Sequence, residues 1–355
     1  MDKKRNYNID FLRGIATLCI LLIHTTFWSG EAYLPKWFIA LSMLIDVPAF
    51  MFISGITFNF SNSFSKNIKG IVEQWKKWIY FLIYYISILA IFFRDQTSFK
   101  EIFNWLFYSF PSKTKLIVTQ GSIWFIPMYI LVTIFSTATI SLLKKHLSDK
   151  HFSDSIKTII ITLLVAFLYS TRLPKTQTIL LIDKVTLFYL LIYFVGYYSN
   201  TKKISTTKFI VLESLCITLF YLFIQLNGLQ FTRLQKYKFP PNYAYLLFSS
   251  ISIVLFWYLK DKLKIKEKNP INFIGKNAIF YYYAQGISSS ILIHINDLVT
   301  IKNIWLKFIT MFGINLIIGL LLGTFLTITY SKIINLIKQI KNKNNDEKVL
   351  YFPKA

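Results

Sequence analysis

Apolar stretches of about 20 residues recur along the whole chain, which is the length a helix needs to cross a bilayer. Of its 355 residues, 54% are hydrophobic, and the mean hydropathy is +0.49. A backbone in lipid must satisfy its own hydrogen bonds, as a helix does. The pattern predicts an all-α, polytopic transmembrane bundle. We expect about ten spans, at residues 8–28, 37–60, 78–94, 121–143, 156–171, 178–198, 208–226, 243–260, 271–294 and 305–335.

Lys and Arg residues in the predicted loops indicate how the chain is oriented. With the N-terminus in the cytoplasm, ten spans place the C-terminus there too. The cytoplasmic segments then carry about twice as many Lys and Arg residues as the external ones, as the positive-inside rule requires. We therefore predict that both termini are cytoplasmic, with a membrane domain at 1–337 and a polar tail at 338–355 that ends in disorder.

The longest external segment in this topology, residues 95–120, is rich in aromatic side chains such as Phe103 and Trp105. It could fold over the outer mouth of the bundle. It could equally form an amphipathic segment that lies in the membrane interface. The sequence leaves both arrangements open.

The formal net charge of +24 restricts the partners of the chain. In a soluble protein this charge would suggest nucleic acid. Here the lysines lie in short loops between apolar spans, so we expect anionic lipid as the electrostatic partner and no nucleic acid. The two cysteines, Cys19 and Cys216, lie inside apolar runs and form no metal or redox motif. We expect no bound cofactor and no metal site.

The first predicted span carries three polar residues that are costly in lipid: Asp10, Arg13 and His24. Arg13 and His24 are eleven residues apart, so they share one helix face about 16 Å apart along the axis. Asp10 lies one turn before Arg13 and can pair with it. Arg13 could simply snorkel to the interface, and His24 could bond a neighbouring helix. A catalytic or ligand-binding role is the third reading.

The first span also carries a resemblance to a known family. The run from Asp10 to Ala16 reads DFLRGIA, and His24 follows Arg13 after ten residues. This opening resembles the acyltransferase family 3 proteins, which are integral-membrane enzymes that move acyl groups, often acetyl, onto sugars and other surface molecules. The resemblance implies an O-acyltransferase in the bacterial plasma membrane.

Two further stretches resemble the family in the second and third spans. The run 45–55 reads IDVPAFMFISG, in which Asp46 needs a partner, for which His24 and Arg13 are the candidates. Ser54 precedes a glycine, and a Ser-Gly pair favours close helix packing over a nucleophile. The run 73–80 reads EQWKKWIY and places Lys76 and Lys77 where the family usually has arginines. These lysines could bind an anion or merely mark the cytoplasmic side.

Two later motifs also match, one of them with a departure. The run 121–127 reads GSIWFIP and places Trp124 at the start of an outer-facing helix. The run 275–285 reads GKNAIFYYYAQ and matches a family motif that contains Tyr282 but commonly ends in His, where this chain has Gln285. Gln cannot shuttle a proton near neutral pH. His294 is a possible substitute for that histidine.

The resemblance implies acyl transfer from cytoplasmic acyl-CoA, with acetyl-CoA as the expected donor. Arg13, Lys76 and Lys77 would bind the anionic donor. His24 would act as general base or as a transient acyl carrier, with Asp46 or Asp10 orienting it. The acceptor would be a polysaccharide or a lipid-linked sugar of the cell envelope. The alternative is a transporter or export component, because intramembrane charge also marks transport pathways.

Overall fold

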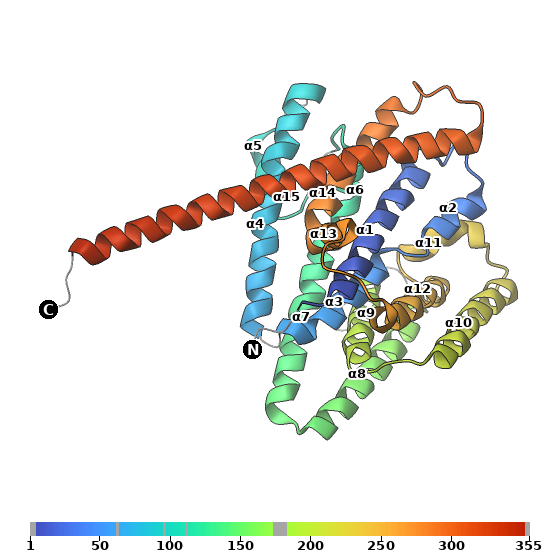
Figure 1. Ribbon diagram of the computed structural model, residues 1–355. Coiled ribbons are helices and arrows are strands. Elements are labelled where there is room, and N and C mark those ends of the chain that lie inside the picture. The colour runs from blue at the N-terminus through green and yellow to red at the C-terminus, as the bar shows by residue number, and fades with distance from the viewer. Residues whose placement is uncertain (1–4, 62–63, 95–96, 111–112, 173–182, 352–355) are drawn as a thin grey trace.

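The computed structural model describes residues 5–61, 64–94, 97–110, 113–172 and 183–351, and these residues form a bundle of helices (Figure 1). No strand occurs in these ranges, so the predicted all-α class is confirmed. The helices are α1 (Tyr7–Trp28), α2 (Lys36–Ser42), α3 (Val47–Ser61), α4 (Phe64–Ile88), α5 (Phe99–Leu106), α6 (Ile117–Ile123), α7 (Phe125–His146), α8 (Asp149–Ser170), α9 (Lys184–Asn200), α10 (Thr206–Leu226), α11 (Leu234–Lys238), α12 (Tyr243–Lys262), α13 (Pro270–Lys276), α14 (Ala278–Ile295) and α15 (Ile304–Tyr351). A π-helical turn, Leu89–Phe93, extends α4, and a 3-10 turn, Phe231–Arg233, precedes α11.

Eight helical segments within the described residues are long and apolar enough to cross a membrane, which confirms a polytopic helical membrane protein. The predicted spans at 178–198 and 271–294 are not among them. Helix α9 has 17 residues, and positions 178–182 lie outside the described residues. Helix α14 has 18 residues and carries Tyr, Gln and Ser side chains. Most residues of both helices are buried, and a helix enclosed by protein needs less apolar character than one facing lipid. Ten spans and cytoplasmic termini remain predictions.

Glycines allow the central helices to touch backbone to backbone. A Cβ atom on Gly55 of α3 would lie 2.0 Å from the carbonyl oxygen of Tyr193 on α9, and one on Gly196 of α9 would lie 2.1 Å from that of Phe52. The same holds where α1 meets α13, because a Cβ atom on Gly275 would lie 1.7 Å from the carbonyl oxygen of Asp10. Small residues at such crossings are typical of membrane helix packing. The crossing with α13 holds α1, which carries Arg13 and His24, close to the C-terminal part of the bundle.

Helix α15 continues past the predicted end of the last span at residue 335. It has 48 residues and ends at Tyr351, so the predicted tail at 338–355 is helical as far as the structure describes it. Figure 1 shows the C-terminal part of α15 projecting away from the bundle. The sequence between Gly323 and Pro353 contains no glycine or proline, and nothing in it breaks the helix once α15 has formed.

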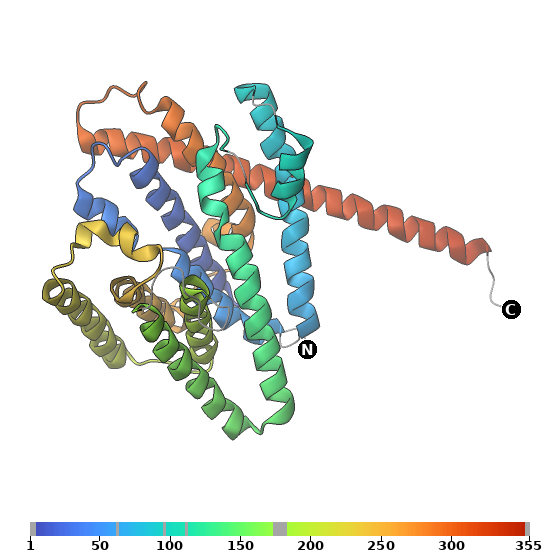
Figure 2. The same ribbon diagram turned by 180° about the vertical axis from the view of Figure 1, so that it is seen from behind.

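The segment 95–120, predicted to be external, contacts α4 through its described helix α5. Figure 2 shows the teal α5 beside the upper half of the cyan α4. Trp105 of α5 is fully buried, and its carbonyl oxygen accepts a hydrogen bond of 2.7 Å from the indole N–H of Trp78. The indole of Trp75 donates to the carbonyl of Leu106 in the same way, at 3.0 Å. The described part of this segment thus packs on α4, and both arrangements that the sequence left open stay predictions.

Candidate functional site

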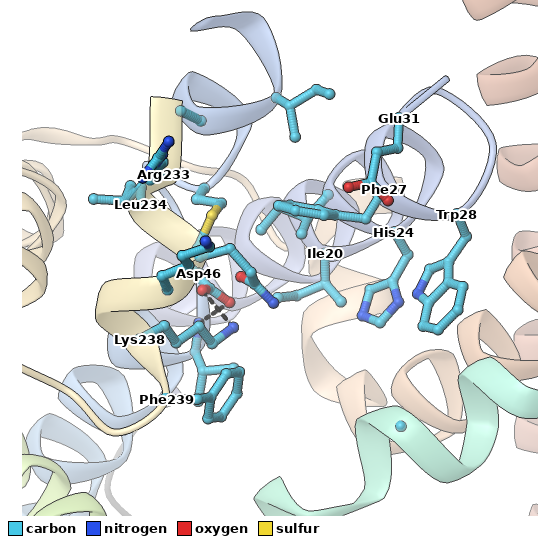
Figure 3. Close-up of a pocket in the computed structure, with 18 of the residues that line it drawn as sticks. Ile20, His24, Phe27, Trp28, Glu31, Asp46, Arg233, Leu234, Lys238 and Phe239 are labelled. Carbon is cyan, nitrogen blue, oxygen red and sulfur yellow. Dashed lines mark hydrogen bonds and ion pairs between the residues drawn. The ribbon is translucent and has the colours of Figure 1, made fainter. Parts of the chain in front are cut away.

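A cavity of about 660 Å³ lies beside the C-terminal end of α1. The end of α1, the following loop and α2 form one wall, together with the start of α3. The segment 230–239, which includes α11, lies across from them, and Gly121, Ser122, Trp124 and Tyr282 complete the lining. Figure 3 shows His24 and Trp28 at one side of this cavity and Asp46 with Lys238 at the other. The cavity therefore joins segments that are far apart in the sequence.

His24 lines the cavity and has a free ring nitrogen. Its Nδ1 atom is buried and has no hydrogen-bond partner among the described residues. Lys238 and Asp46 lie near enough to interact electrostatically with the ring. A structural histidine in a helix bundle would normally bond a neighbouring helix. A histidine that lines a cavity and makes no hydrogen bond through Nδ1 instead suits a group that meets a ligand.

Asp46 has partners that the sequence did not indicate. Its carboxylate accepts a hydrogen bond of 2.6 Å from the ammonium of Lys238 and one of 2.9 Å from the hydroxyl of Tyr245. It also accepts a bond of 2.7 Å from the backbone N–H of Val47. The prediction that His24 or Arg13 pairs with Asp46 is therefore wrong. Lys238 was missed because 192 positions separate it from Asp46.

Lys238 and Trp124 complete this side of the cavity. The Lys238 ammonium lies 5.8 Å from the centre of the Trp124 ring and 5.2 Å from that of Phe239. The Trp124 and Phe239 rings meet edge to face, with centroids 4.9 Å apart. A cation over an aromatic face gains electrostatic stabilisation from the ring. Trp124, predicted at the interface, thus lines the cavity.

Arg13 and Asp10 lie at the other end of α1. The carboxylate of Asp10 is 3.6 Å from the Arg13 guanidinium, as the spacing predicted, and it also pairs with Arg5. Asp10 precedes His24 by fourteen residues, which is about 21 Å along a helix. Asp10 can therefore balance the charge of Arg13, but it cannot orient His24.

Lys76 and Lys77 make contacts separate from Arg13 within the described residues. The ammonium of Lys76 is 3.8 Å from Glu73 on an exposed face of α4. The ammonium of Lys77 lies 5.6 Å from the ring centre of Phe280, near the start of α14. Helix α14 follows directly on α13, which packs against α1 at Asp10 and Gly14. Lys77 thus lies toward the same end of the bundle as Arg13.

The remaining predicted residues divide between the cavity and its surroundings. Tyr282 lines the cavity, and its hydroxyl donates to the carbonyl of Ser122 at 2.5 Å. Ser54 does not line it, and its hydroxyl donates to the carbonyl of Phe50 in its own helix. His294 is also outside the cavity lining, where its Nε2 atom lies 3.1 Å from the carbonyl oxygen of Lys115. His294 also lies nine residues beyond Gln285 on α14, about 13 Å along the helix, and is therefore not placed to replace a histidine at position 285.

Gln285 is fully buried, and neither polar atom of its amide has a hydrogen-bond partner among the described residues. It lies on α14 between Tyr282, which lines the cavity, and Ser289, whose hydroxyl accepts a bond of 3.1 Å from Asn315. Asn315 also donates to the hydroxyl of Thr25, next to His24 on α1. An unpaired buried amide is destabilising by roughly 1 to 3 kcal/mol.

Replacement of Gln285 by methionine is expected to raise the free energy of unfolding by roughly 1 to 2 kcal/mol, because methionine has a similar shape and no unpaired polar atoms. Thermal unfolding of the purified variant in detergent measures the change. Gln285→His serves as the comparison, since it retains a polar group. A lower unfolding temperature for Gln285→Met would show that the amide makes stabilising hydrogen bonds.

These features define a class, an integral-membrane protein with a cavity at one end of its first helix that contains charged side chains. A family model described as an acyltransferase domain matches residues 6–334. The chain therefore belongs to acyltransferase family 3 and is a membrane acyltransferase. The match confirms the family resemblance of the sequence motifs and covers nearly the whole chain. No curated protein and no solved structure matches the chain.

Proposed function

We propose that this membrane acyltransferase moves an acyl group, acetyl in the simplest case, from cytoplasmic acyl-CoA to a hydroxyl of a cell-envelope sugar or polysaccharide. The observation that carries the proposal is that His24 lines a cavity of about 660 Å³ and that its ring makes no hydrogen bond through Nδ1 to a neighbouring helix. A positioned acid–base group with one face toward a cavity is what hydroxyl acylation needs. The plasma membrane of a bacterium is the expected location.

The donor would enter from the end of the bundle that holds Arg13. Acyl-CoA carries several phosphate groups, and a guanidinium binds phosphate through two parallel hydrogen bonds. Arg13 keeps a partly exposed side chain and pairs with Asp10 at 3.6 Å, so it can exchange this partner for a phosphate. Lys77 lies toward the same end and adds positive charge. The long pantetheine arm would then extend along α1 toward His24, about 16 Å away.

The chemistry would take place where the arm meets the cavity. A ring nitrogen of His24 accepts the proton of the acceptor hydroxyl as its oxygen attacks the thioester carbonyl carbon. The carbon–sulfur bond then breaks, and the protonated His24 returns the proton to the thiolate of CoA. The products are the acyl ester and free CoA. The Lys238 ammonium lies across the cavity, paired with Asp46 but within electrostatic range of His24, and its positive charge would favour the negative charge that develops on the carbonyl oxygen.

The test is consumption of radiolabelled acetyl-CoA by the purified full-length protein in detergent, with envelope polysaccharide as acceptor. We expect free CoA to appear and label to pass to the acceptor. Arg13→Lys keeps the charge but loses the two-pronged geometry, so it should raise the KM for acetyl-CoA by about tenfold while turnover persists at saturating donor. A folded wild-type protein that cleaves no thioester would overturn the proposal and favour transport.

A further inference from the structure

One segment, residues 230–239, covers the side of the cavity that faces α1 and α2. Two buried side chains hold this segment against the bundle. Leu234 is fully buried, and Lys238 is 7% exposed and forms the ion pair with Asp46. Arg233 immediately precedes Leu234, and Lys236 lies between Leu234 and Lys238. Both side chains are exposed and line the cavity. Burial of Leu234 and the ion pair of Lys238 therefore position the cations of Arg233 and Lys236 at the mouth of the cavity.

The charges that line the cavity do not cancel. Its cations are Lys36, Arg233, Lys236 and Lys238, and its carboxylates are Glu31 and Asp46. Asp46 and Lys238 neutralise one another at 2.6 Å. Within the part of the chain that the structure describes, Lys36, Arg233 and Lys236 form no ion pair. Three cations thus face one remaining carboxylate, that of Glu31, and the mouth of the cavity is electropositive.

These cations lie on the predicted external side of the membrane, where basic residues are uncommon. In the predicted orientation, the C-terminal end of α1 and the segment 230–239 are external. The positive-inside rule disfavours basic residues in short external loops, yet Arg233, Lys236 and Lys238 occur within six positions. Membrane insertion gives no reason for them. Lys238 is explained by Asp46, whereas Arg233 and Lys236 have no partner that would explain them among the described residues.

We propose that the acceptor is an acidic glycan, whose carboxylate or phosphodiester groups are held by Arg233, Lys236 and Lys36 while a neighbouring hydroxyl reaches His24. This inference rests on the proposed acyl transfer and names its acceptor class. The guanidinium of Arg233 can bind either anion through paired hydrogen bonds. The cavity of about 660 Å³ lies within the usual size range of small-molecule sites, roughly 300 to 1,000 Å³, and suits a short part of a glycan chain.

The test compares acceptors of equal length in the acetyl-CoA assay: a neutral glucose oligomer, a galacturonate oligomer and a glycerol-phosphate oligomer. We expect the wild-type protein to favour at least one anionic acceptor in kcat/KM by about tenfold or more, and to lose that preference at high salt. Arg233→Gln/Lys236→Gln should reduce the ratio of anionic to neutral acceptor use by about tenfold. The matched control, Lys202→Gln/Lys203→Gln, removes two exposed lysines beyond α9 and should retain the ratio.

Two results would overturn the inference. One is equal use of neutral and anionic acceptors by the wild-type protein. The other is a loss in the double variant that appears only in nanodiscs containing anionic lipid, which would assign the cations to lipid headgroups. Direct binding of the same oligomers, measured without acetyl-CoA, separates this inference from the proposed function. Suppose that anionic oligomers bind in a way that depends on Arg233 and Lys236, but no thioester is cleaved. This result would contradict the acyl-transfer proposal and support the anion-binding site.

Discussion

The His24→Ala variant is expected to bind acyl-CoA nearly as well as the wild-type protein but to transfer acyl groups about 10² to 10⁴-fold more slowly, which is the usual contribution of a positioned acid–base group. Donor binding should survive because Arg13 lies near the opposite end of α1, where it pairs with Asp10. The transfer step should suffer because the imidazole of His24 is lost from the lining of the cavity. Acyl-CoA binding, turnover and thermal unfolding are measured on the same preparations.

A structural role for His24 gives the opposite pattern. The variant would then unfold at a lower temperature and show near-normal specific activity in its folded fraction. Its unpartnered Nδ1 atom makes this outcome unexpected, because the imidazole contributes no hydrogen bond through that nitrogen. Full turnover by folded His24→Ala protein would contradict a catalytic role for His24.

Removal of Asp46 should have the largest effect on stability. In Asp46→Ala, the Lys238 ammonium stays buried without its carboxylate, and the Tyr245 hydroxyl loses its acceptor. Breaking a buried ion pair from one side costs about 3 to 5 kcal/mol. We expect a large fall in the unfolding temperature in detergent, or failure to purify as a folded protein.

A double variant keeps this prediction testable. Asp46→Ala/Lys238→Met removes both charges, fills the space with an apolar side chain, and should recover most of the lost stability. The control Asp154→Ala breaks the exposed pair with Lys157, which has an N–O distance of 2.9 Å, and should leave the unfolding temperature unchanged. An Asp46→Ala protein as stable as the wild type would contradict the assigned ion pair. If the stable double variant is inactive, the pair also serves the chemistry beside His24.

Features that depend on one helix were predictable from the sequence. The spacing of Arg13 and His24 placed them at different depths of α1, and the short spacing of Asp10 and Arg13 gave their ion pair. The apolar runs gave the helical membrane bundle, and the motifs gave the family. In each case the contact, or the repeat of apolar residues, that determines the feature lies within one continuous stretch of the chain.

Features that depend on two distant segments were not predictable. Nothing near Asp46 or Lys238 in the sequence says that they meet, because the pairing is set by the packing of α11 and α12 beside α3. The signal available in the sequence was the basic run from Arg233 to Lys238 in a predicted external loop, which the positive-inside rule does not explain. Gln285 was similar, since its burial without a partner depends on the surrounding helices.

The ion pair between Asp46 and Lys238 also constrains how the protein is made. Ribosomes add roughly 5 to 20 residues per second, so the 192 positions between these residues correspond to about 10 to 40 s of synthesis. During that interval α3 and its carboxylate exist before their partner has been synthesised. Helix α1 is likewise made before α13, the helix against which Gly14 of α1 packs. An unpaired carboxylate costs roughly 2.5 to 3.5 kcal/mol at mid-membrane, so the N-terminal helices reach their full stability only when the later helices arrive.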